Sequence, residues 1–150
     1  MTTLTGGRAS KRPWHLWAVG LVGVLWNSYG CLDYTMTALQ GDVWLRSQGM
    51  TDAAVAFTEA MPAWMTAVWA IGVWGAMLGS LLLLLRSRWA FPVFVISLAA
   101  YVMSLVYQYV LTDGATGMGE SIWIMQTVIL FICLFFVWYA QMATKRGILR

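Results

Sequence analysis

Charged residues are scarce in this chain: they form 10% of its 150 residues, whereas an ordinary soluble domain has about 25%. Apolar residues form 61% and the mean hydropathy is +0.72. A soluble globular domain is therefore excluded, because too few polar side chains are present to cover its surface. The composition predicts an integral membrane protein instead.

Metal-ligating and nucleophilic side chains are also few. His15 is the only histidine, so a single chain cannot hold a haem between two histidines or supply the usual His/Cys set of a zinc site. Cys31 and Cys133 are expected at depths that differ by roughly 9 Å at about 1.5 Å per residue, beyond the limit of about 7 Å between the Cα atoms of a disulfide. No nucleophile elbow, phosphate loop or paired-carboxylate motif is present. We therefore predict a non-enzymatic protein with no catalytic residue, metal site or cofactor.

Four apolar segments reach the roughly 20 residues that a membrane-spanning helix needs. They cover residues 14–39, 62–85, 89–111 and 121–143. The first is longer than the apolar part of a signal peptide, about 7–15 residues, so we expect it to remain as a span. The turn 86–88 is so short that the second and third spans must be antiparallel. The predicted fold is a single all-α domain, an integral membrane four-helix bundle.

Basic residues are concentrated on one side of these predicted spans. Eight of the nine lysines and arginines are Arg8, Lys11, Arg12, Arg86, Arg88, Lys145, Arg146 and Arg150. Cytoplasmic loops collect such residues, so we expect both termini in the cytoplasm. Since the basic clusters adjoin apolar spans, they indicate topology and not a nucleic-acid partner.

The longest loop, residues 40–61, is expected outside the cell. Thr51 is a suitable N-cap for a short external helix that continues to Ala60. Such a helix must end before Pro62, because the residue before a proline disfavours helical geometry.

Small residues recur at helical spacing in the first two spans. The set comprises Gly20, Gly23, Gly30, Gly72, Gly75 and Gly79. Glycine lets the backbones of two membrane helices approach closely. We therefore expect the first and second spans to pack together through these faces, or each face to meet another subunit.

Polar side chains within the apolar segments gather in the expected outer half. Asp33 is the only acid among them, and an acid inside a membrane segment is costly unless it serves a function or finds a partner. The candidate ligand-binding residues are Asn27, Asp33, Tyr34, Gln108 and Gln126. A stripe of Ser97, Ala100, Ser104 and Gln108 in the third span is expected to face them. Two interpretations remain open: an outward-opening pocket for a cation, proton or sugar-like hydroxyl, and simple hydrogen bonding between helices.

Several short strings along nearly the whole chain resemble a group of small four-span bacterial inner-membrane proteins of unsettled role. They include Trp14-His15-Leu16-Trp17, Leu25-Trp26-Asn27, Asp33-Tyr34, Pro62-Ala63-Trp64 and Gly72-Val73-Trp74-Gly75. Some members of that group carry an automatic label of sugar transporter. The resemblance implies the four-span topology and a location in a bacterial inner (plasma) membrane, and it supplies no residue with a defined role.

Two functions fit these patterns. The fourth span is apolar nearly all round from Val128 to Val137, as expected of a surface that meets lipid or another membrane subunit. This favours an accessory or interaction subunit of a larger membrane complex of respiratory or photosynthetic type. The alternative is a small solute transporter, sugar-like or coupled to a cation or proton. It would act as a homo-oligomer, because four spans enclose little volume. Both functions require the lipid bilayer as a partner.

Overall fold

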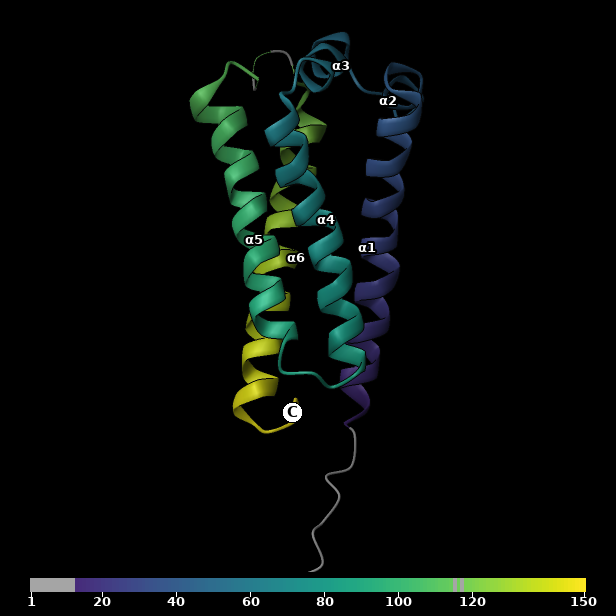
Figure 1. Cartoon of the computed structure of the whole chain (residues 1–150). Coiled ribbons are helices and arrows are strands. Elements are labelled where there is room, and N and C mark those ends of the chain that lie inside the picture. Colours follow the sequence, from purple (N-terminus) through teal and green to yellow (C-terminus); the bar gives the residue numbers. More distant parts are fainter. Residues whose placement is uncertain (1–12, 115, 117) are drawn as a thin grey trace, which may run out of the picture.

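The computed structural model describes residues 13–114, 116 and 118–150, and within this part the chain is helical with no strand. Four long helices lie side by side: α1 (Trp14–Gln40), α4 (Ala63–Leu84), α5 (Ala90–Val106) and α6 (Glu120–Lys145). The π-helix η1 (Tyr107–Leu111) continues α5. The short helices α2 (Asp42–Ser47) and α3 (Asp52–Glu59) cover one end, which we call the α3 end, and the chain ends at the other, the C-terminal end (Figure 1).

The sequence predicted the positions of the four long helices well. The predicted ranges 14–39, 62–85, 89–111 and 121–143 agree with the observed helices within two residues at each end. The predicted short helix after Thr51 is confirmed as α3, and the Thr51 hydroxyl accepts a hydrogen bond from the Ala54 amide at 3.2 Å. Helix α2 was not predicted. It begins after Gly41, whose φ of 54° breaks the backbone direction of α1.

Three of the long helices in the described part of the chain are long and apolar enough to cross a membrane: α4, the continuous helix formed by α5 with η1, and α6. Helix α1 is not among them, because Asn27, Ser28 and Asp33 make it more polar. The sequence prediction of four spans is thus supported for three. The predicted basic residues Arg8, Lys11 and Arg12 lie outside the described residues.

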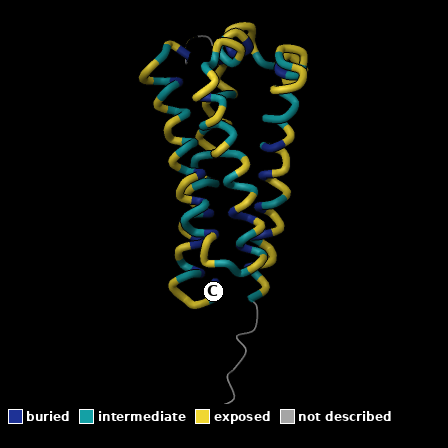
Figure 2. The backbone as a smooth tube through the Cα atoms, in the orientation of Figure 1, coloured by how far each residue is buried: buried dark blue, intermediate teal, exposed yellow. Residues whose placement is uncertain are grey.

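The main apolar core lies at the C-terminal end. It contains Leu16, Leu83, Ala90, Phe94, Phe136, Tyr139, Ala140, Ala143 and Leu149. The rings of Phe94 and Phe136 stack with centroids 5.2 Å apart, which joins α5 to α6. Exposed positions follow the outward-facing turns of all four long helices (Figure 2). The core therefore occupies one end of the molecule and leaves the sides apolar and open.

The residues after α6 fold back onto the turn between α4 and α5. Gly147, with a φ of 68°, ends α6 and reverses the chain. The Arg150 amide donates to the Arg86 carbonyl at 2.7 Å, and the Arg88 amide donates to the Arg150 carbonyl at 3.0 Å. These bonds hold Leu149 in the core with 4% of its surface exposed. The short segment thereby joins the end of α6 to the turn between α4 and α5.

The expected pairing of glycine faces is wrong for α4. Gly72, Gly75 and Gly79 face α5, and a methyl group built on Gly79 would lie 2.8 Å from the Phe94 ring. Gly20 and Gly23 of α1 do pack on α4, but against its larger side chains Leu84 and Ser80. Gly30 approaches Val73 of α4 at 3.8 Å. Close approach therefore occurs at both interfaces of α4, with a glycine on only one of the two helices each time.

Candidate functional site

The five candidate polar residues do not form one site, since the structure divides them into separate groups. Asn27 is buried between α1 and α4. Its amide nitrogen donates to the Ser80 hydroxyl at 2.9 Å and to the Ala76 carbonyl at 3.2 Å. Both contacts hold α1 on α4, so the interpretation as a hydrogen bond between helices is confirmed for Asn27.

Asp33 contacts the short helix α2. One carboxylate oxygen accepts a hydrogen bond from the indole nitrogen of Trp44 at 2.8 Å. This bond fixes the direction in which the chain leaves α1, because only a few residues separate the helix end from Trp44. Asp33 therefore has a local structural partner.

Gln108 and Gln126 belong to a third group, which joins η1 to α6. The Gln126 amide donates to the Gln108 side-chain oxygen at 2.8 Å, and the Gln108 amide donates to the Met118 sulfur at 2.6 Å. The Tyr109 hydroxyl donates to the side-chain oxygen of Gln126. The neighbouring residues Gln108 and Tyr109 of η1 therefore both bind Gln126 of α6. The amide groups are thus engaged with each other.

The predicted polar stripe of the third span does not face α1. Ser97 donates to the Gly72 carbonyl of α4 at 2.6 Å, and Ser104 donates to the Ala100 carbonyl of its own helix at 3.1 Å. Helix α4 lies between α1 and α5 (Figure 1) and separates the stripe from Asn27 and Asp33. The expectation of a shared polar pocket is therefore wrong.

Tyr34 lies at a different site from the other four candidate residues. Its ring meets Trp69 of α4 edge to face, with centroids 5.0 Å apart and an interplanar angle of 80°. Both rings border a pocket of about 180 Å³ between α1, α3 and α4, which we call the Tyr34 pocket. Its lining comprises Tyr34, Thr37, Ala38, Thr58, Glu59, Met61, Thr66 and Trp69.

Sequence reasoning identified only Tyr34 among these lining residues. A usable signal was present in the spacing, because Tyr34 and Thr37 are three residues apart, and so are Thr66 and Trp69. Residues three apart share a helix face, so each helix presents one aromatic ring and one hydroxyl on the same side. Glu59 had no comparable signal, since α3 reaches the site only through the tertiary fold.

Charge differs strongly between the two ends of the described structure. The six acids lie toward the α3 end, where Arg46 is the one base described. Arg46 contacts Asp52 and also Asp42 at 3.8 Å, and the hydrogen bond with Asp52 raises the pKa of the Arg46 guanidinium. The α3 end therefore carries a clear negative excess.

The remaining predicted groups have simple roles in the described structure. Cys31 and Cys133 are free thiols, as predicted. His15 Nδ1 and the Tyr139 hydroxyl are 2.6 Å apart, and this bond joins α1 to α6. Across the described residues, no group of three histidine, cysteine or acidic side chains is placed to hold a metal ion.

The described part of the chain is thus all-helical, with three candidate membrane-spanning helices and a small pocket between α1, α3 and α4. Among known proteins, no family model, no curated protein and no solved structure matches the chain.

Proposed function

We propose that this protein is a non-enzymatic subunit of a larger bacterial inner-membrane complex, which crosses the membrane four times and contacts another subunit through α6. The supporting observation is that α6 buries only Phe136, Tyr139, Ala140 and Ala143 of its 26 residues. All four lie toward the C-terminal end of the helix. The rest of α6 has little cover within its own chain.

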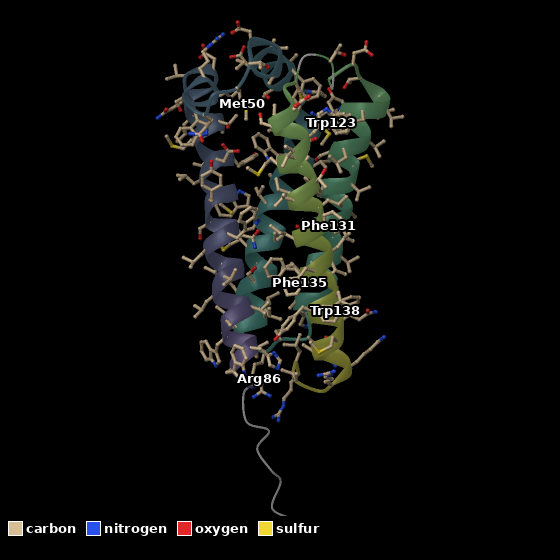
Figure 3. All side chains as sticks on the ribbon, turned by 180° about the vertical axis from the view of Figure 1, so that it is seen from behind. Met50, Arg86, Trp123, Phe131, Phe135 and Trp138 are labelled. Atoms are coloured by element: carbon tan, nitrogen blue, oxygen red, sulfur yellow. The ribbon has the colours of Figure 1, made fainter. Side chains whose placement is uncertain are left out.

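The exposed side of α6 has a regular pattern. Five apolar residues, which we call the α6 stripe, follow an alternating spacing of four and three residues along the helix. They are Ile124, Val128, Phe131, Phe135 and Trp138. Phe131 is 67% exposed and Trp138 57%, and Figure 3 shows Phe131, Phe135 and Trp138 following one another along the helix. This spacing keeps one side of a helix against a neighbour over several turns. A second transmembrane helix with small residues at its contact face would fit such a stripe.

The polar residues favour the subunit function over transport. A transport site near the membrane midplane usually groups polar side chains between broken helices. Here Asn27, Asp33 and Gln126 lie in separate groups, each with a hydrogen-bond partner on another element.

Cross-linking in living cells tests the α6 contact. A photoreactive amino acid at Phe131 should give one protein adduct of defined mass, because that side chain would lie in the interface. The same group at Leu21, 51% exposed on α1, serves as the matched control and should give at most a weak adduct. The Phe131 adduct must contain a protein that also copurifies with the unmodified chain in mild detergent, as identified by mass spectrometry. Adducts with lipid alone would contradict the subunit function.

The charge distribution supports an orientation with both termini in the cytoplasm. Figure 3 places Arg86 at the end opposite Met50. Arg88 lies in the same turn as Arg86, Lys145 ends α6, and Arg146 and Arg150 lie in the segment that follows α6. Cytoplasmic ends of membrane proteins collect such residues.

Reporter fusions test this orientation. Fusions after residues 6, 50, 87, 116 and 147 should report inside, outside, inside, outside and inside. The fusion after residue 6 decides whether α1 crosses, because a chain with three spans would place that position outside. An outside signal there, with the other four unchanged, would remove α1 from the membrane.

A further inference from the structure

We infer that the Tyr34 pocket binds a small organic ammonium group, of the kind found in choline or in the ethanolamine headgroup of a lipid. The site is separate from the α6 stripe and does not depend on the proposed subunit function. Three elements contribute to its wall: α1 provides Tyr34 and Thr37, α3 provides Glu59, and α4 provides Trp69.

The wall contains the groups that recognise organic cations. Tryptophan and tyrosine rings attract ammonium groups through their electron-rich faces, and proteins use such rings to bind quaternary ammonium ligands. The edge-to-face arrangement of Tyr34 and Trp69 turns the two ring planes to different directions. Glu59 adds one negative charge at the rim and has no ion pair within 4 Å among the described residues. Among the residues that the structure describes, no lysine, arginine or histidine contributes to the lining.

Few polar groups of the pocket are free to bind a ligand, which argues against ligands that need several polar contacts, such as a metal ion. Thr58 donates to the Ala54 carbonyl at 2.9 Å and Thr66 to the Pro62 carbonyl at 3.4 Å, so both hydroxyls are engaged with their own chain segments. A calcium ion takes six to eight oxygen ligands, several from carboxylates, and Glu59 is the only carboxylate in the wall. One carboxylate and two aromatic rings therefore suit a largely apolar cation better than a calcium ion.

The hydroxyl of the third threonine in the lining differs from the other two. The Thr37 oxygen is buried and has no hydrogen-bond partner among the described residues. A buried polar atom without a partner is unusual and costs stability. The lone pairs of this oxygen would attract a positive charge held in the pocket.

The volume of the pocket and the negative charge around it limit the size and the charge of the ligand. A pocket of about 180 Å³ is smaller than the roughly 300–1,000 Å³ of sites for drug-sized molecules. The excess of acids at the α3 end attracts cations to this region before they bind. The ligand is therefore a compact cation or the terminal ammonium of a larger molecule whose remainder lies outside the pocket.

Titration calorimetry with choline chloride, at constant ionic strength and with the full chain in detergent, tests the inference. The wild type should bind choline saturably, and Glu59→Gln should weaken binding about tenfold, because the charge is lost while the size is kept. Trp69→Leu should also weaken it. Glu120→Gln is the matched control, since it removes an equal charge at the same end outside the pocket. It should change affinity by less than about twofold.

The outcomes are distinct. Absence of saturable binding to the wild type would overturn the inference. So would equal weakening by Glu59→Gln and Glu120→Gln, because it would show a general charge effect only. Glu59 is exposed, so Glu59→Gln should fold normally, which circular dichroism checks.

Nanodiscs with and without phosphatidylethanolamine identify the source of the ammonium. Competition with choline by this lipid assigns the pocket to a headgroup, and unchanged choline affinity assigns it to a free solute.

Discussion

Gly79→Leu should prevent α4 and α5 from packing and should lower the free energy of unfolding by about 3 kcal/mol or more. Even the single methyl group of Gly79→Ala would lie 2.8 Å from the buried Phe94 ring. Phe94 cannot move freely, because it stacks on Phe136. A leucine side chain would therefore force the two helices apart. The measurement is thermal or denaturant unfolding in detergent, followed by circular dichroism and by size-exclusion chromatography.

A neighbouring glycine provides the control for Gly79. A methyl group on Gly72 would meet the Ala100 side chain at 3.8 Å, an ordinary contact. Gly72→Ala should therefore leave stability unchanged or raise it slightly, since alanine favours a helix by up to about 1 kcal/mol over glycine. In a double variant with Gly79→Ala, Phe94→Leu should restore part of the loss, because contacting residues are not additive. Equal stability of Gly79→Leu and wild type would show that this interface does not form.

Leu149→Ala should lower the free energy of unfolding by about 2 kcal/mol, toward the low end of the range for a buried leucine. Leu149 is 4% exposed in the core. The backbone bonds between Arg86, Arg88 and Arg150 are retained in this variant, so the loss reports the apolar contact alone. Unfolding is again measured in detergent by circular dichroism.

Leu85→Ala is the matched control for Leu149→Ala. Leu85 lies at the same end and is 76% exposed, so its truncation should change stability by less than about 0.5 kcal/mol. If both variants unfold together with the wild type, the segment after α6 does not stabilise the fold.

Helix positions followed from the amino-acid sequence because the signals for them are local. Apolar length, the proline at residue 62 and the cap at Thr51 each act within a few residues of the chain. The break at Gly41 was missed because glycine in a polar loop predicts a turn without indicating that a helix follows it. The thiols of Cys31 and Cys133 could be assigned as separate because depth depends only on the rise along each helix.

The sequence by itself therefore determined the all-helical class, the bounds of the four long helices within two residues, and the unequal distribution of charge. Only the tertiary structure decided that the α4 glycines meet α5, that Gln108 and Gln126 pair away from Asp33, and that Tyr34 and Trp69 border one pocket with α3. The physical reason is that a membrane helix is apolar on nearly every side, so its pattern does not distinguish the face that packs from the face that meets lipid. Spacing fixes which residues share a face, and only the packing of the helices fixes what that face contacts.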